Sequence, residues 1–380
     1  MSKIGIIGSY LTEFKGRREN ENRNQLINET VVSVLEDAQL SINDIDKVIS
    51  ASCDTIDGIS ISNAFAADDM GAYMKEESKV EDDGAYALMY AYYRMLTGEW
   101  KNCLLVAHAK PSDAGPAFYA NMSCDPFYLR PMGLELNTSA ALQARKYYET
   151  FGLSEEDAAE VAVKNRKAGS KNPRTQLRKE ISVQDVMNSS YLASPLKELE
   201  SAPLTDGAAA VILSTEDFAK NAKNKPVWID GFGFAQDNYY PGNRDLSRCN
   251  AGKTAAQKAY KEAGIKDLMQ EVDFAEVCES YAFYEMMLYE SLGLCKEGEG
   301  IKLIKDGVTD INGKFPVNPS GGTLCANPII VSGLVRVIES YLQLTGKAGD
   351  NQVAQNKGKA LVHAASGMFM QSNLVSILSI

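Results

Sequence analysis

Three consecutive acids, Glu81, Asp82 and Asp83, stand immediately before a stretch from Gly84 to Gly98 whose apolar residues have helical spacing. A helix dipole stabilises carboxylates at its start, where they also cap the first N–H groups, so a structural cap by Asp82 or Asp83 is the simpler interpretation. The chemical interpretation is a general base for an aldol or retro-aldol step, which needs no covalent intermediate. Mutual repulsion would raise the pKa of at least one of these acids if they were buried together.

Thiols and imidazoles are the other candidates for chemistry. The seven cysteines are scattered without a CxxC pair, which argues against both a disulfide framework and a zinc ribbon. Cys278 and Cys325 are candidate nucleophiles, although a cysteine at the end of a strand is more often a buried apolar residue. The sequence has two histidines, His108 and His363, which excludes a metal site built on several histidines, and we expect no metal.

Composition and charge restrict the class of protein. Of the 380 residues, 45 % are hydrophobic and 23 % charged, as in globular domains, and no apolar run approaches the ~20 residues that span a bilayer. The amino terminus, MSKIGIIGSY, lacks the pattern of a signal peptide. A formal net charge of -11 disfavours nucleic acid and anionic lipid as partners. We therefore expect a soluble, cytoplasmic protein with reduced thiols.

One basic segment, from Lys164 to Lys179, interrupts this acidic chain and includes Arg174 and Arg178. A solvated helix face followed by a loop is the simpler interpretation. The functional interpretation is a docking point for a small phosphorylated ligand, with Arg174 and Arg178 among its contacts.

The chain reads as two halves, residues 1–225 and 226–380, that begin alike. In the first, the strand-like KIGIIGSY precedes a helical stretch and the strand-like KVISASCD, and in the second PVWIDGFGF precedes a helical stretch and EVDFAEVCES. Two such βαβ units can pack about a pseudo-twofold axis with a site between them. The segment from about 108 to 203 is predicted to be an insertion that carries binding loops.

Five ordered blocks carry a family resemblance. They read NDIDKVISASCDTIDG, SAPLTDGAAAVILSTEDFA, EVCESYAFYEMMLYESLGLCKEGEG, GKFPVNPSGGTLCANPIIVSGLVRVIE and KALVHAASGMFMQSNLVSIL. In this order they resemble the thiolase superfamily, in particular its sterol-carrier-protein-like and archaeal acetyl-CoA acetyltransferase branch. The resemblance implies an α/β protein with the duplicated thiolase fold, five layers αβαβα and a loop domain inserted in the first half. It also implies at least a dimer, and acyl-CoA substrates in which coenzyme A is a substrate moiety and no other cofactor takes part.

The resemblance places the acid triplet at the family's reactive position. When Gly84 is set on the glycine of the family's CASG motif, Glu81 falls where the nucleophilic cysteine belongs. A shift of one or two places puts Asp82 or Asp83 there instead. None of the three is a thiol.

The other reactive blocks are also substituted. Cys278 stands for the histidine of an HDCF-like block, and Asn327 for the histidine of the GHP block. An asparagine amide can donate a hydrogen bond to an oxyanion, but it cannot transfer a proton. His363 keeps the place of a histidine that this branch often has. The resemblance implies substrate or CoA contacts at Ser320, Gly321, Gly322 and Tyr281, and the basic segment adds Arg174 and Arg178 to the expected CoA contacts.

The sequence therefore predicts a thiolase-like acyl-CoA protein that acts on a carbon–carbon bond next to a CoA thioester without the standard cysteine acyl-enzyme. An acid from positions 81 to 83, Asn327 and His363 would carry this aldol or Claisen chemistry. One alternative is a non-catalytic subunit of a hetero-oligomer that contains a cysteine-bearing thiolase and a zinc-ribbon OB-fold protein. Another is an acetyl-CoA acetyltransferase whose nucleophile has moved to Cys278 or Cys325. A homodimer or a hetero-oligomer is expected.

Overall fold

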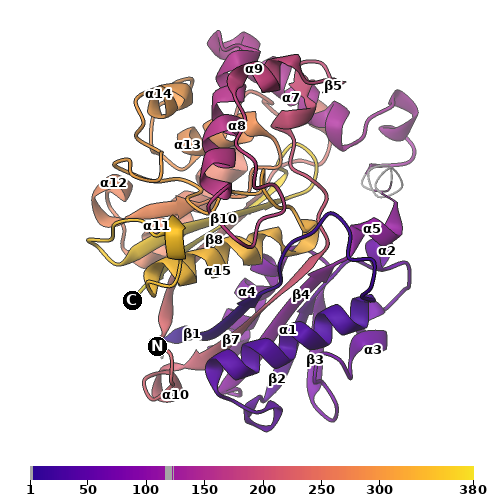
Figure 1. Cartoon of the computed structure of the whole chain (residues 1–380), viewed down its shortest axis with the longest axis vertical. Helices are drawn as coiled ribbons and strands as arrows, with labels where there is room; N and C mark the ends of the chain where they lie inside the picture. Colours follow the sequence, from indigo (N-terminus) through magenta and orange to yellow (C-terminus); the bar gives the residue numbers. More distant parts are fainter. Residues whose placement is uncertain (1–2, 116–121, 123) are drawn as a thin grey trace.

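The computed structural model describes residues 3–115, 122 and 124–380 (Figure 1). Its centre is a mixed sheet in the order β3-β2-β4-β7-β1-β8-β11-β10-β9. Strands β4 and β7 are buried almost throughout, as their near-continuous apolar sequences require. The strands are β1 (Ile4–Leu11), β2 (Lys47–Ala51), β3 (Glu76–Val80), β4 (Asn102–Ala109), β7 (Gly207–Thr215), β8 (Val227–Gln236), β9 (Phe274–Glu276), β10 (Lys359–Ser366) and β11 (Ser372–Ser379).

The two parts of the sheet repeat one topology. In the first part, β1 pairs antiparallel with β7, β7 antiparallel with β4, and β4 parallel with β2. In the second part, β8 pairs antiparallel with β11, β11 antiparallel with β10, and β10 parallel with β9. The parts join where Gly5 pairs with Trp228 and Ile6 with Val227. The sequence repeat thus corresponds to a repeated strand order, in which Cys53 follows β2 as Cys278 follows β9.

The helices and the two parts of the sheet form five layers (Figure 1). Helix α1 (Arg23–Ala38) covers the outer face of the first part, while α11 (Asn250–Ala263) and α13 (Ala282–Ser291) cover the second. Helices α4 (Gly84–Met95) and α15 (Ser332–Leu344) lie between the parts and share one hydrophobic core with both. In α15, 12 of its 13 residues are buried, because neighbours surround it on all sides. The structure confirms the expected α/β architecture in five layers.

A long insertion connects β4 to β7 and contains α7 (Leu136–Phe151) and α8 (Glu155–Gly169). Helix α8 packs on α13 of the second half, where Lys164 forms a buried ion pair with Glu285. The described part of the chain has no helix with both the length and the apolar character needed to cross a membrane. The shorter elements are α2 (Asp54–Asp57), α3 (Ser62–Ala66), α5 (Pro111–Ala114), α9 (Val183–Asn188), β5 (Tyr191–Ala193), β6 (Leu196–Lys197), α10 (Glu216–Ala219), α12 (Leu268–Glu271) and α14 (Gly300–Lys305).

Candidate active site

A pocket of about 590 Å³ opens where the amino-terminal ends of α4 and α15 meet. Both halves of the chain line it, with Cys53 after β2 and Cys278 after β9, and so does the start of α7 in the insertion. Ligands of α/β proteins commonly bind beyond the carboxyl ends of parallel strands, where helices begin. The fold therefore provides one site to which all three parts of the chain contribute.

Asp83 connects the two central helices. Its Oδ1 accepts the N–H of Ala85 in α4 at 2.8 Å, and its Oδ2 accepts the N–H of Gly333 in α15 at 2.7 Å. One carboxyl group thus caps two helices, which bears out the structural interpretation of an acid at this turn. Burial raises the pKa of Asp83 to about 8, and the two N–H donors act against that rise.

Asp82 is the carboxyl group of the triplet that is most available to a ligand. It lines the pocket and is held by the N–H of Asp83 at 2.7 Å and by the hydroxyl of Ser366 at 3.3 Å. No cation pairs with it among the described residues. Burial raises the pKa of Asp82 above its ordinary value, which is the direction that suits a general base.

Glu81 also lines the pocket, but its charge is already paired. Lys79 lies 2.6 Å from its Oε2, and its Oε1 accepts the N–H of Asp54 at 2.7 Å. Its side chain is 49 % exposed, so water screens it as well. The three acids that the sequence could not tell apart therefore have three different environments.

The two thiols at the pocket, Cys53 and Cys278, lack the environment of a nucleophile. Burial raises the pKa of Cys278, and the charge of Asp83 raises it further. Burial likewise raises the pKa of Cys53. Because the thiolate is the reactive form, both groups are protonated and weakly nucleophilic at neutral pH.

Two residues of the second half that line the pocket, Asn327 and Tyr284, carry hydrogen-bond donors. The Oδ1 of Asn327 accepts the hydroxyl of Ser332 at 2.7 Å, which fixes the amide and leaves its Nδ2 without a partner among the described residues. Tyr284 also lines the pocket, and within the described part of the chain its hydroxyl has no partner. Burial holds the pKa of Tyr284 well above its ordinary value, so this hydroxyl stays protonated.

Tyr281 is positioned by the insertion. Its hydroxyl donates to Oδ1 of Asn137 at 2.8 Å, and its ring meets that of Tyr284 edge to face at 5.7 Å between centroids. Burial raises the pKa of Tyr281, and the nearby charge of Glu135 adds to the rise. The donated proton is thereby committed to Asn137, which leaves Tyr284 as the freer donor of the pair.

A strained turn, Gly367 to Met370, forms another wall of the pocket. Phe369 and Met370 have left-handed backbones with φ of 57° and 50°, which is costly for residues with a side chain. Arg244 stabilises this turn by donating to the carbonyl oxygens of Met368 at 3.3 Å and Phe369 at 2.6 Å. Strain of this kind persists only where the surroundings hold it, so this wall has a fixed shape.

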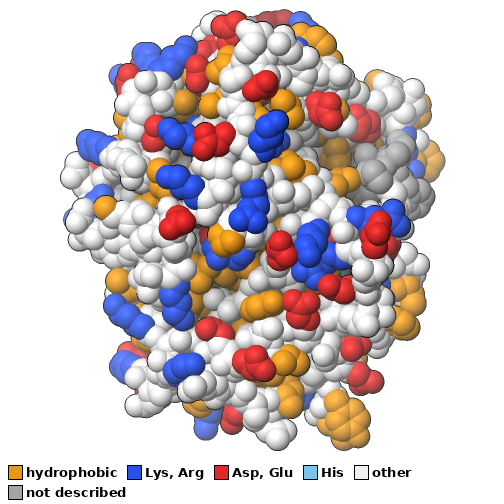
Figure 2. Space-filling view, viewed as in Figure 1, with side chains coloured by type: hydrophobic (Ala, Val, Ile, Leu, Met, Phe, Trp, Pro, Cys, Tyr) orange, Lys and Arg blue, Asp and Glu red, His pale blue; other side chains and the backbone are white. Residues whose placement is uncertain are grey.

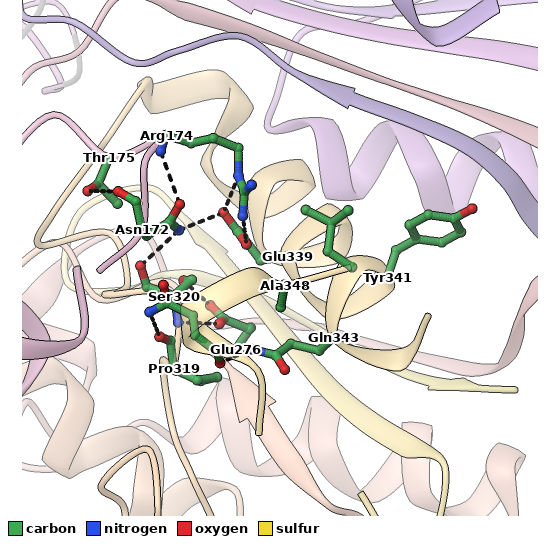
Figure 3. Close-up of polar contacts among 12 residues, drawn as sticks. Asn172, Arg174, Thr175, Glu276, Pro319, Ser320, Glu339, Tyr341, Gln343 and Ala348 are labelled. Atoms are coloured by element: carbon green, nitrogen blue, oxygen red, sulfur yellow. Dashed lines mark hydrogen bonds and ion pairs between the residues drawn. The ribbon is translucent and has the colours of Figure 1, made fainter. Parts of the chain in front are cut away.

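Ser320, Gly321 and Gly322 lie behind the pocket instead of lining it. Ser320 donates through its N–H and its hydroxyl to Glu276, as Figure 3 shows. Gly321 and Gly322 have φ of 101° and 68°, and a Cβ on Gly322 would come 2.0 Å from Oε1 of Glu279. The structure gives these residues a packing role and does not bring them to the cavity that the sequence expected them to line.

His363 is likewise separated from the acids. It is fully buried, its Nε2 lies 2.9 Å from Oδ1 of Asn373, and burial lowers its pKa to about 4. It lies in β10, on the face toward the outer core, and not among the residues that line the pocket. Its expected place beside the acids is therefore corrected, because the strand turns its side chain away from them.

The basic segment also divides into different environments. Arg174 donates to both carboxylate oxygens of Glu339, at 3.2 Å and 2.9 Å (Figure 3). Arg178 is exposed. On the face drawn in Figure 2, basic and acidic side chains are interspersed. Neither arginine lines the pocket.

Sequence reasoning missed several residues of the pocket, among them Glu135, Asn137 and Ser366. A signal existed for Glu135, because the spacing of Glu135 and Thr138 is that of a helix cap, and the structure has this reciprocal cap at the start of α7. No local pattern indicated that α7 begins at the pocket.

Comparisons with known proteins identify the family. Residues 235–380 match the family model described as Thiolase C-terminal domain-like. Over 381 residues the chain is 30 % identical to the acetyl-CoA acetyltransferase of Methanocaldococcus jannaschii, in an alignment that covers 97 % of this chain and 96 % of that protein. The chain belongs to the thiolase superfamily.

Two further similarities concern this thiolase-like protein. It is 32 % identical over 237 residues to the benzoylsuccinyl-CoA thiolase subunit BbsB of Thauera aromatica, which covers 62 % of this chain and 61 % of that protein. The solved structure of the Ltp2-ChsH2(DUF35) aldolase superposes with a TM-score of 0.84 at 24 % identity, over 98 % of this chain and 97 % of that one. At that identity the structural likeness supports the fold.

Proposed function

We propose that this thiolase-like protein makes or breaks a carbon–carbon bond next to a CoA thioester without a covalent acyl-enzyme. Coenzyme A enters as the carrier of the acyl group, and the reaction needs no other cofactor. One observation carries the proposal. The same pocket contains an available carboxylate, Asp82, and thiols whose pKa is raised. Two proteins that it resembles are named an acetyl-CoA acetyltransferase and an aldolase, and the second of these names supports a reaction of the aldol type.

In the cleavage direction, Asp82 would accept the proton of a 3-hydroxyl group on the acyl chain. The electrons of that O–H bond form a carbonyl at the former hydroxyl carbon as the bond between carbons 2 and 3 breaks, so an aldehyde or ketone leaves. The bonding pair passes to the thioester enolate, which takes up a proton at carbon 2 and becomes the shortened acyl-CoA. A carboxylate can perform this step because only a proton is transferred to it.

The enolate oxygen needs donors that are in place before the reaction. Asn327 and Tyr284 would supply them, since both residues line the pocket and neither the amide nitrogen of one nor the hydroxyl of the other has an internal partner in the described structure. Removing one such donor from an oxyanion site typically costs on the order of 10²-fold in rate. Asn327 thus keeps the hydrogen-bonding part of the role that the family gives to histidine.

The acetyltransferase alternative requires a reactive thiol. Cys325 is fully buried, its pKa is raised to about 12 by burial, and it does not line the pocket. Cys278 does line the pocket, but its pKa is also raised. These environments favour the non-covalent reaction.

The test is to incubate the purified protein with a panel of 3-hydroxyacyl-CoA thioesters that differ in the group on carbon 3. Chromatography should detect a shortened acyl-CoA and a matching aldehyde or ketone, and the intact mass of the protein should not change. A stable acyl adduct on Cys278 or Cys325 would overturn the proposal in favour of the acetyltransferase.

A second candidate is a subunit that works only with a partner. Two names favour it: BbsB is called a subunit, and the Ltp2-ChsH2(DUF35) aldolase names two components. The expected partners are a cysteine-bearing thiolase and a zinc-ribbon OB-fold protein. Co-expression with each, followed by size-exclusion chromatography and the same assay, separates the candidates, because activity of the isolated chain excludes the purely dependent role.

A further inference from the structure

The pocket has an unusual balance of charge for a protein proposed to bind an anionic thioester. Among the described residues that line it, four carry carboxyl groups (Glu81, Asp82, Asp83 and Glu135) and none is a lysine, arginine or histidine. Carboxylates facing a partly enclosed cavity act on a ligand more strongly than they would in open water. Because Lys79 balances Glu81 and burial raises the pKa of Asp83 to about 8, Asp82 and Glu135 carry most of the unbalanced charge. The interior of the pocket is therefore unfavourable for an acyl group that bears a negative charge of its own.

Three cations contact or lie next to residues that line the pocket, and each already has a partner within the protein. Lys79 pairs with Asp54 and Glu81. Arg244 donates to carbonyl oxygens of the Gly367 to Met370 wall, and Arg336 pairs with Glu276 behind Cys278. Arg244 also pairs with Asp237 at 3.4 Å, so each of these three cations already has an acidic partner.

Glu135, one of the four acids, has no part in the proposed reaction. Its Oε1 accepts the N–H of Thr138 at 2.8 Å, which caps α7, and its Oε2 accepts no hydrogen bond from the described residues. Glu135 lines the cavity beside Tyr281, and its charge helps to raise the pKa of that tyrosine. A glutamine could provide the same cap without the charge.

We propose that the pocket selects acyl thioesters whose acyl group bears no negative charge, and that Glu135 is a specificity-determining residue that excludes carboxylated acyl groups. The inference rests on the proposed function, because it assigns the substrate class of that same site. The remaining lining agrees with a neutral, largely apolar acyl group: Leu136, Leu192, Leu204, Ile329 and Ile330 contribute to it.

The experiment compares pentanoyl-CoA with glutaryl-CoA, whose acyl chains have the same number of carbons and differ by one terminal carboxylate. Isothermal titration calorimetry of the full chain at neutral pH and low salt gives both affinities. We expect glutaryl-CoA to bind more weakly by on the order of tenfold or more, which is the effect of one close like charge in a partly screened site. In Glu135→Gln this gap should shrink severalfold, chiefly because glutaryl-CoA binds better.

The control is Glu149→Gln, which removes the same charge from an exposed position on the same helix and should leave the gap unchanged. An apolar pocket alone also disfavours a carboxylate, so a gap that Glu135→Gln does not alter would overturn the assignment of Glu135. Equal affinity for the two thioesters would overturn the whole inference. If neither thioester binds, the proposed function fails and the inference falls with it.

Discussion

Two carboxyl groups near the pocket, Asp82 and Glu276, differ in what surrounds them more than in how deeply they lie. Glu276, at the end of β9, is fully buried and accepts hydrogen bonds from the N–H and hydroxyl of Ser320 and from Arg336 at 2.7 Å. Asp82 has two neutral donors, pairs with no cation in the part of the chain that the structure describes, and lines the cavity.

The difference teaches how to read buried acids in this protein. A carboxylate whose lone pairs are all occupied and whose charge is balanced holds the structure together and has nothing left for a substrate. One with an unoccupied side in a cavity can accept a proton from a ligand. Glu276 is enclosed and paired with a cation, whereas Asp82 is half-buried beside the cavity, so the surroundings of each acid decide its role.

The largest expected effect concerns Glu276, the acid that is enclosed and paired with a cation. Arg336→Ala leaves Glu276 buried without its cation, which should lower the free energy of unfolding by about 3–5 kcal/mol. Urea denaturation measures the loss. Arg248→Ala is the matched control, because Arg248 makes exposed ion pairs with Asp245 and Glu297 and should change the stability by about 1 kcal/mol or less. Similar losses in the two variants would remove the distinction between saturated and exposed pairs.

Asp82→Asn tests whether the carboxylate of Asp82 is the general base. It keeps the shape of the side chain but cannot accept a proton from the substrate, so kcat/KM for cleavage of a 3-hydroxyacyl-CoA should fall by about 10²-fold or more. The free energy of unfolding should stay within about 1 kcal/mol of the parent. Glu81→Gln, which alters a paired and exposed acid, should retain most of the activity. A reversal of these two results would move the base to position 81.

Glu200 lies between the two extremes and predicts a pH dependence. It is fully buried, one oxygen accepts the N–H of Lys197 at 2.7 Å, and the other has no partner within the described residues. Burial raises the pKa of Glu200 to about 7 from 4.5. Between these values the unfolded chain releases the proton while the folded chain keeps it, so this group's stabilisation is present below pH 4.5 and is lost as the pH rises to 7.

The loss should be on the order of 2–3 kcal/mol. Urea denaturation between pH 4.5 and pH 8 measures it as the difference between the parent and Glu200→Gln, in which this contribution is absent. Parallel curves for the two proteins would mean that Glu200 ionises in the folded state as readily as in the unfolded chain.

The smallest effect extends the comparison to cations. Arg174 forms an ion pair with Glu339, whereas Arg178 is exposed. Arg178→Ala should therefore weaken the affinity for coenzyme A by roughly twofold to threefold, as expected for one exposed charge. Arg174→Ala should leave that affinity unchanged and lower the stability. Calorimetry at low and high salt checks both variants. If only Arg174→Ala weakened the affinity for coenzyme A, Arg174 and not Arg178 would be the contact with the ligand.

Much of the fold was predictable because it depends on local patterns. The alternation of apolar segments and the repeated strand, helix and strand order indicated a duplicated α/β protein, and the acids before Gly84 indicated a helix cap, which Asp83 provides. The site was predictable only in part. His363 was grouped with the acids because of its sequence block, but the strand that carries it turns the side chain to the opposite face.

What the sequence by itself determined was the family architecture, the start of α4 and the presence of acids where a thiol is usual. Only the tertiary structure decided which acid is available to a ligand, because the partners of these acids are remote in sequence. Gly333 donates its N–H to Asp83, and Ser366 donates its hydroxyl to Asp82. It also brought Glu135 and Asn137 to the pocket from the insertion. Helical periodicity and capping are set by neighbours along the chain, whereas desolvation and charge balance are summed over groups that folding brings together.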